Sequence, residues 1–243
     1  MNGKGDVISQ RQQNIVAILE GIFSLLILSS SAIPFAESDN INPTVFAIED
    51  KPYGMTYGEW TAKWWQWIVS IPEMNHPSLD LTGEKCAIGQ EGPVWFLTNT
   101  FGGKAERTCT IPAGKAILIP IINGECDYLT TENAKTEADL LRCASEGNEN
   151  GIMEFTIDGI RLKNLENYRV QSPVFNITII EDNAFGASSG PTRAIADGFW
   201  VFLNPLSVGQ HDIHFKGSVV DPSDVLGFKS YSTDVIYHLI VKP

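Results

Sequence analysis

The stretch "FTIDGIRL", Phe155 to Leu162, decides the fold class, because it reads as two short strands joined by a two-residue turn. Asp158 and Gly159 supply the positive φ values that such a turn requires. Similar short apolar runs, bounded by Gly, Pro and Asn, recur from Cys86 to the C-terminus, and they read as strands. They are "PVWFLT", "KAILIPI", "IMEFTI", "VFNITII", "GFWVFL", "HDIHFKGSV" and "DVIYHLIV". Strands without interleaved helices predict a mainly β fold, an antiparallel β-sandwich or jelly-roll-like domain.

Upstream of these strands, the segment "YGMTYGEWTAKWWQWIVSIP", Tyr53 to Pro72, holds four of the six tryptophans. Thr56 and Glu59 form a capping box, so we expect a helix that begins at Tyr57 and ends near Ile71, before the proline. One face of this helix is apolar, which predicts that it packs against the sheet. The residues of that face are Tyr57, Trp60, Trp64, Trp67, Ile68 and Ile71.

Trp65 is the one tryptophan of this segment that lies outside the apolar face. Either it packs under a loop such as "GQEGP", or it stays partly exposed at the rim and contributes to a binding surface. Trp95 and Trp200 fall inside predicted strands, where a core role is the first interpretation. Trp65, Trp95 and Trp200 are nevertheless the candidate ligand-binding residues if the protein stacks aromatic rings on sugars.

A second, short helix is expected from about Glu137 to Glu146, with Thr136 as its N-cap and Gly147 as its stop. The four cysteines show no CxxC spacing of a zinc or redox motif, so we interpret them as two disulfides. Three connectivities are open, and sequential pairing is preferred because each loop is short and rich in turns. The expected pairs are Cys86 with Cys109 and Cys126 with Cys143.

The first 36 residues resemble a secretory signal: two basic residues precede an apolar run, Ile15 to Ala36, that ends in small residues. Cleavage is expected after Ala36, with Ala32 as the alternative. An uncleaved membrane anchor is the rival interpretation, but Glu20 would lie within the span. The domain plan is therefore a signal peptide or anchor (1–36), a linker (37–52) and a single secreted domain (53–243).

Export and composition together limit the partners. The chain of 243 residues is acidic, with a net charge of −12 and no run of Lys or Arg, so nucleic acid is not an expected partner. A membrane is expected as partner only through an uncleaved leader. Asn176, in "NIT", fits a glycosylation acceptor if its strand turns it outward.

Several segments together resemble a family of secreted proteins met in ammonia-oxidising archaea and some soil bacteria. They are "YGEWTAKWWQW", "GPVWFL", "CTIPAGKAILIPI" and the ending "IHFKGSV" to "DVIYHLIV". The resemblance covers most of the chain after the leader. It implies export and carries over no catalytic residue or cofactor.

The motifs that suggest chemistry are weak. "GASSG" places Ser188 in a nucleophile-like pattern, but Pro191 follows at once and no helix is expected after it. His211 and His214 would face opposite sides of a strand, so no transition-metal site or cofactor is expected. The acidic runs "GECD" (Glu125, Asp127), "EDN" and "DPSD" lack calcium-loop spacing, and a solvated surface is their first interpretation.

These observations predict a noncatalytic protein of the cell exterior, a structural or interaction module. Glycan recognition by exposed tryptophans is the alternative, and a secreted hydrolase is a weaker one because the sequence shows no catalytic set. The expected partner is cell-envelope polysaccharide or a surface protein.

Overall fold

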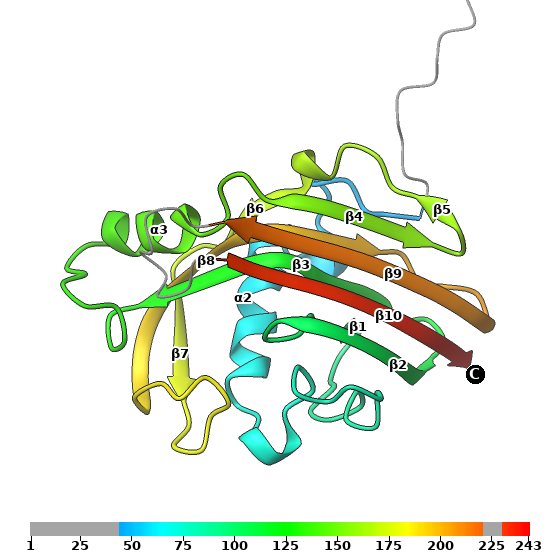
Figure 1. Ribbon diagram of the computed structural model, residues 1–243, viewed down its shortest axis with the longest axis horizontal. Helices are drawn as coiled ribbons and strands as arrows, with labels where there is room; N and C mark the ends of the chain where they lie inside the picture. Colours follow the sequence, from blue (N-terminus) through cyan, green and yellow to red (C-terminus); the bar gives the residue numbers. More distant parts are fainter. Residues whose placement is uncertain (1–43, 221–229) are drawn as a thin grey trace, which may run out of the picture. The chain divides into compact units, whose positions relative to one another are not determined.

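The computed structural model describes residues 44–220 and 230–243 (Figure 1). The predicted leader, the first part of the predicted linker and the "DPSD" run lie outside the described residues. The rest of the expected linker is packed, which corrects the boundary at Tyr53. Val45 forms a β-bridge with Leu203, and the ring of Phe46 lies edge-on to Phe202 at 5.1 Å. Both apolar side chains cover sheet residues, so the domain includes them.

Two sheets form the domain, and the predicted mainly β, sandwich-like class is confirmed. In the first sheet the order is β1 (Val94–Phe96), β3 (Ala116–Asp127), β8 (Gly190–Leu203) and β6 (Arg169–Gln171), and β7 (Phe175–Ile179) also pairs with β8. In the second the order is β2 (Gly103–Pro112), β10 (Ser230–Lys242), β9 (Gly209–Val220), β4 (Ile152–Ile157) and β5 (Ile160–Arg161).

The sheets are mixed rather than wholly antiparallel, which refines the prediction. β1 pairs with β3 in parallel, and β2 pairs with β10 in parallel. The chain passes from β1 through β2, in the opposite sheet, before it returns to β3, and such crossovers bring strands back parallel. The Asp158–Gly159 turn is confirmed, since both residues have positive φ (50° and 77°) and Ile157 pairs with Ile160.

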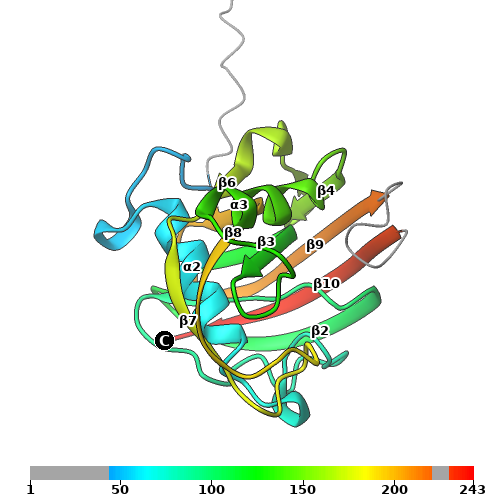
Figure 2. The ribbon, with the colours of Figure 1, turned by 90° about the vertical axis from the view of Figure 1, so that its left-hand side faces the viewer.

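Three layers result from the burial of these elements. The helix α2 (Tyr57–Ile68) covers one face of the first sheet, and the second sheet covers the other face, as the views in Figures 1 and 2 show. β3 and β8 are buried on both faces, which explains their continuous apolar runs. β9 and β10 alternate between buried and more exposed positions because their outer face meets solvent.

Local signals in the sequence set the helix ends. Thr56 accepts the N–H of Glu59, and the Glu59 carboxylate accepts the N–H of Thr56, as the capping box predicts. α2 ends at Ile68, earlier than expected, because the chain tightens and Ile71 donates to the carbonyl three residues back. The helix α3 (Glu137–Glu146) has the expected bounds. Short 3₁₀ turns lie at Pro52–Gly54, Glu73–Asn75 and Leu165–Tyr168.

Both predicted disulfides are confirmed, and each joins Cα atoms 6.0 Å apart. The Cys86–Cys109 bond ties the loop before β1 to β2. The Cys126–Cys143 bond ties the end of β3 to α3. Among the described residues, no helix is long and apolar enough to cross a membrane.

Candidate functional site

The three tryptophans proposed for ligand binding are all buried. Trp95 is 6% exposed and Trp200 is 0% exposed, and neither lines the cavity described below, so both are core residues, as their first interpretation has it, and neither offers a ring on which a sugar could stack. Their strands face packed layers on both sides, which leaves no surface for a ligand. Trp65 is also buried, at 8% exposed, so it is not the half-exposed rim residue that one interpretation placed there.

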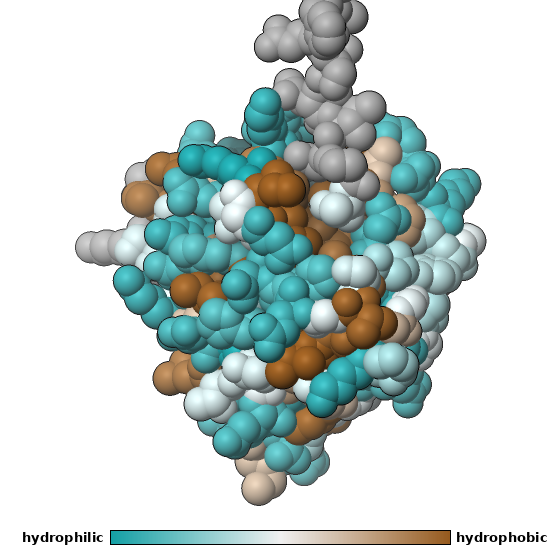
Figure 3. All heavy atoms as spheres, turned by 90° about the vertical axis from the view of Figure 1, so that its right-hand side faces the viewer, coloured by the Kyte–Doolittle hydropathy of each residue, from teal (hydrophilic) through white to brown (hydrophobic). Residues whose placement is uncertain are grey.

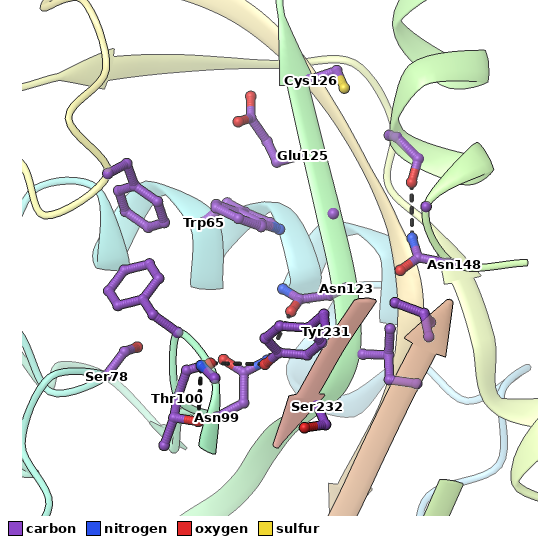
Figure 4. Close-up of a pocket in the computed structure, with 18 of the residues that line it drawn as sticks. Trp65, Ser78, Asn99, Thr100, Asn123, Glu125, Cys126, Asn148, Tyr231 and Ser232 are labelled. Atoms are coloured by element: carbon purple, nitrogen blue, oxygen red, sulfur yellow. Dashed lines mark hydrogen bonds between the residues drawn. The ribbon is translucent and has the colours of Figure 1, made fainter. Parts of the chain in front are cut away.

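Trp65 nevertheless forms part of a cavity of about 610 Å³ at one end of the sandwich. α2, the end of β3, α3, the ends of β9 and β10, and the loops before β2 and β8 contribute its walls. A volume of this size suits a small organic ligand. Figure 4 shows Glu125, Trp65 and Asn123 together beside β3.

A β-bulge in β3 directs Asn123 and Glu125 into this cavity. Ile117 and Ile119 point into the core between the sheets, but the pairing with β8 shifts between Pro120 and Ile122. After the shift Ile122 occupies that core, so the odd-numbered residues beyond it turn to the other face, where α2 lies. The bulge thus removes Glu125 from the core between the sheets and places it beside Trp65.

Two glycines let the neighbouring chains approach the bulge closely. A Cβ on Gly198 of β8 would lie 2.5 Å from the Ile122 carbonyl oxygen. A Cβ on Gly217 of β9 would lie 2.6 Å from the Ile122 side chain. No larger residue fits at either position without moving β3, so the position of this cavity wall is fixed from both sides.

Glu125 is the chemically unusual residue of the cavity. Its Oε1 atom is buried and has no hydrogen-bond partner, although other atoms of the residue are partly exposed. Burial raises the pKa of the Glu125 carboxyl to about 8, and the nearby Asp127 adds a smaller upward effect. At neutral pH this acid is therefore largely protonated.

Two donors beside Glu125 also lack partners: Asn123 Nδ2 and Trp65 Nε1. The other three tryptophans of α2 have a partner for their indole N–H. Trp64 donates to the Leu97 carbonyl at 2.9 Å, for example, and the remaining two donate to Pro52 and Ile88. Buried polar groups without partners are uncommon in folded proteins, and three of them gather on one cavity wall here. His76 Nε2 and the indoles of Trp95 and Trp200 also lack partners, but these three residues do not line this cavity.

Side-chain hydrogen bonds hold the part of the wall around Tyr231 and Asn99. The Tyr231 hydroxyl donates to the Thr100 carbonyl at 2.7 Å, and Asn99 donates to Asn123 Oδ1 at 3.2 Å (Figure 4). Burial raises the pKa of Tyr231 to about 12, so its hydroxyl stays neutral. These bonds hold the loop before β2 and fix the orientation of the Asn123 amide, with its nitrogen left free of partners.

Aromatic rings form the outer, apolar part of the cavity. Phe101 and Phe185 are 45% and 38% exposed and meet edge-on with ring centroids 5.2 Å apart. Phe185 also lies 5.9 Å from the Trp65 ring. The buried ring of His76 packs behind both phenylalanines, and burial lowers its pKa to about 4, so it is neutral.

The other sequence motifs lie away from the cavity. Ser188 is exposed in a loop that leads directly into β8, so the strand–turn–helix context of a nucleophile is missing. His214 and His238 lie on the outer face of the second sheet and pair with carboxylates, His238 with both Asp212 and Glu106. The Asn176 side chain is exposed on β7, as its use as a glycosylation acceptor requires.

The surface at the far end of the sandwich is mixed in character. Figure 3 shows small hydrophobic patches there, separated by hydrophilic side chains. Large exposed hydrophobic residues at this end are Ile160, in the β4–β5 hairpin, and Val208, just before β9. Scattered exposed residues of this kind are ordinary on a soluble surface.

The sequence draws attention to Glu125 only as part of the acidic run "GECD", and it does not single out Asn123. The first interpretation of that run, a solvated surface, is wrong, because Glu125 Oε1 is buried and Asp127 is fully buried and accepts from the N–H groups of Leu129 and Thr130. A carboxylate in a strand flanked by apolar runs was the available signal. Its direction could not be known without the bulge.

Comparisons with known proteins do not assign the cavity a role. A scan against protein-family models found no match, and a search of curated proteins found none either. The cavity and its side chains are therefore the basis for any functional conclusion.

Proposed function

We propose that this protein is an exported, noncatalytic β-sandwich that binds a small ligand in the cavity beside Trp65. One observation carries the proposal: Glu125 Oε1, Asn123 Nδ2 and Trp65 Nε1 all lack partners on the wall of a 610 Å³ cavity. An unpartnered buried polar group costs about 1 to 3 kcal/mol, so three together are a substantial cost to stability. A ligand that supplies their hydrogen bonds removes that cost.

Support for export comes from the cysteines. Two disulfides are consistent with an extracellular protein, because they persist in oxidising compartments. The leader predicted for residues 1–36 and the family resemblance point in the same direction. The protein's partner outside the cell is then a small molecule, or a group at the end of a larger one.

The number of carboxylates in the cavity favours ligand binding over hydrolysis. Glu125 is the one carboxylate among the described residues that line the cavity. Glycoside hydrolysis needs a second acid across the scissile bond, and Asp127, the nearest candidate in sequence, accepts hydrogen bonds within its own turn. One acid with a raised pKa does not make a catalytic pair.

Glycan recognition is the second candidate, and the exposed Phe101 and Phe185 favour it. Aromatic rings at the edge of a polar cavity suit the apolar face of a sugar. In this version the cavity holds the end of a cell-envelope polysaccharide or of a glycan on a surface protein. The tryptophans of the sandwich core have no part in it.

The test is a ligand screen with matched variants. Differential scanning fluorimetry would be run with a metabolite set that spans amines, neutral sugars, carboxylic acids and phosphates. Compounds that bind in the cavity should raise the melting temperature of the wild type and of Glu154→Gln, which alters the exposed outer face of β4. They should not do so for Asn123→Leu and should do so less for Trp65→Phe, each of which removes one unpartnered donor. A set in which no class of compound shows this pattern would overturn the proposal.

A further inference from the structure

The cavity holds an acid without a basic partner. Glu125 is the one carboxylic acid among the described lining residues, and no Lys, Arg or His lines the cavity with it. A buried carboxylate is costly unless a positive group or several hydrogen bonds accompany it. Glu125 Oε1 has neither in the described part of the chain.

Among the described residues of the other elements around the cavity, none supplies a positive charge to Glu125. From β3 itself comes Asp127, which is a second acid. From β10 comes Tyr231, a neutral phenol, and α3 contributes Cys143, which is bonded to Cys126. The remaining lining side chains of α2, β9 and the loops do not titrate.

Arg107, which hydrogen-bonds to the lining residues Ser78 and Asn99, already uses its donors. Its guanidinium donates to the carbonyl oxygens of Asp80, Thr98, Ser78 and Asn99 and to the hydroxyls of Thr98 and Tyr237. It cannot turn toward Glu125 without losing these bonds. A cation that pairs with the ionised form of Glu125 would therefore come from outside the described chain.

The apolar part of the cavity suits a positive group as well. Trp65, Phe185 and Phe101 form a continuous set of aromatic rings with neighbouring centroids 5.9 and 5.2 Å apart. Aromatic faces attract cations, and tryptophan does so most strongly. The volume is about twenty times that of one water molecule, about 30 Å³, so it suits an organic cation rather than a bare ammonium ion.

We propose that the ligand is a small organic amine whose ammonium group pairs with Glu125 and lies against Trp65, with an oxygen atom nearby that accepts from Asn123. This inference rests on the proposed function and names its ligand class. A neutral sugar satisfies the hydrogen bonds, but it supplies no positive group that would favour the ionised form of Glu125. An anion meets no positive side chain in the described wall.

The pH dependence of binding follows from Glu125. The ammonium group binds the ionised carboxylate, while burial keeps the pKa of this acid near 8 in the free protein. Raising the pH therefore increases the fraction of protein that is competent to bind. The dissociation constant should fall about tenfold from pH 6 to pH 7 and about fivefold more from pH 7 to pH 8.

Isothermal titration calorimetry tests the amine assignment. The ligands are ethanolamine, choline and an uncharged analogue of choline in which a tert-butyl group replaces trimethylammonium. An amine should bind at least about tenfold more tightly than the neutral analogue and show the pH dependence above. Glu125→Gln should lose that preference and the pH dependence, whereas Glu154→Gln should keep both. Amine binding that does not change with pH, or that survives Glu125→Gln, would overturn the inference.

The same measurements separate this inference from the proposed function. If no amine binds but a neutral sugar or an acid does, and that binding is lost in Asn123→Leu, the cavity binds a ligand and the charge assignment is wrong. If no class of compound binds in the cavity, both fail. A Glu125→Gln protein that does not fold would be replaced by Trp65→Phe, which should weaken amine binding and leave the pH dependence intact.

Discussion

Two buried ionisable side chains, Arg107 and Glu125, have opposite surroundings. Arg107 of β2 is 1% exposed, and all three of its guanidinium nitrogens donate to protein oxygens, the shortest bond being 2.6 Å to the Tyr237 hydroxyl. Glu125 of β3 has a buried oxygen with no partner at all. The protein therefore can satisfy a buried charge completely, and at Glu125 it does not.

This difference in hydrogen bonding indicates that Arg107 supports the fold, whereas Glu125 belongs to the proposed binding site. Arg107 joins the segment around Ser78 to the loop at Thr98 and Asn99, and both segments border the cavity. Its role is to hold that border in place, since every donor is used. Glu125 Oε1 makes no such bond, so stability does not explain its buried position, whereas the proposed ligand would.

The largest effect is expected for Arg107→Met, which keeps much of the length but removes every donor. Several carbonyl groups would be left buried without partners, so the free energy of unfolding should fall by roughly 3 to 5 kcal/mol. Chemical denaturation measures this. The control is Lys104→Met on the same strand, whose exposed side chain makes one long ion pair, 3.6 Å, to Asp234 and should matter by less than about 0.5 kcal/mol. Equal losses in the two variants would show that Arg107 is not the scaffold residue described here.

Glu125→Gln should raise the free energy of unfolding, the opposite of Arg107→Met, and the size of the increase should depend on pH. The folded-state pKa of Glu125 is raised from 4.5 to about 8, so between these values the unfolded chain releases its proton while the folded chain keeps it. Wild-type stability therefore falls through this window, and the loss is complete above pH 8. Glutamine does not titrate, so the variant should match the wild type near pH 4 and exceed it by on the order of 2 kcal/mol at pH 8.

Denaturant midpoints measured from pH 4 to pH 8 check this expectation. Glu154→Gln, at an exposed position on β4, is the control and should show no such growing difference. A Glu125→Gln protein that is less stable than the wild type at pH 8 would mean that Glu125 has a structural partner after all. The contrast with Arg107 would then disappear.

Local features of the fold could be predicted from the sequence, but the surroundings of Arg107 and Glu125 could not. The hairpin at Asp158–Gly159, the Thr56 and Thr136 caps and both disulfides are local patterns, and the structure confirms each of them. The parallel pairing of β2 with β10 joins distant segments, and no local pattern specifies it. Neither does any local pattern reveal the network around Arg107, whose partners come from three separate segments.

The cavity depends on the least predictable feature of all. The bulge between Pro120 and Ile122 reverses which side chains of β3 face α2. Strict alternation from Ile117 would place Asn123 and Glu125 between the sheets. The strand itself was predicted, but a one-residue irregularity in its pairing decides where its polar side chains point, and a single sequence does not show it.

The smallest effect is expected for Trp64 and Trp65, which are adjacent in α2. The indole N–H of Trp64 has a hydrogen-bond partner and that of Trp65 has none, so the pair repeats the contrast between Arg107 and Glu125 with an uncharged group. Replacing either by Phe removes an indole N–H and some ring area. Trp64→Phe also leaves the Leu97 carbonyl without its 2.9 Å donor, whereas Trp65→Phe leaves no protein group unpaired. Trp64→Phe should therefore cost about 1 kcal/mol more than Trp65→Phe, because the packing losses of the two buried rings are similar and largely cancel. Paired denaturant curves resolve such a difference. Equal losses would mean that the Trp65 N–H is already satisfied in the folded protein, and the case for a ligand at this wall would then rest on Glu125 and Asn123 alone.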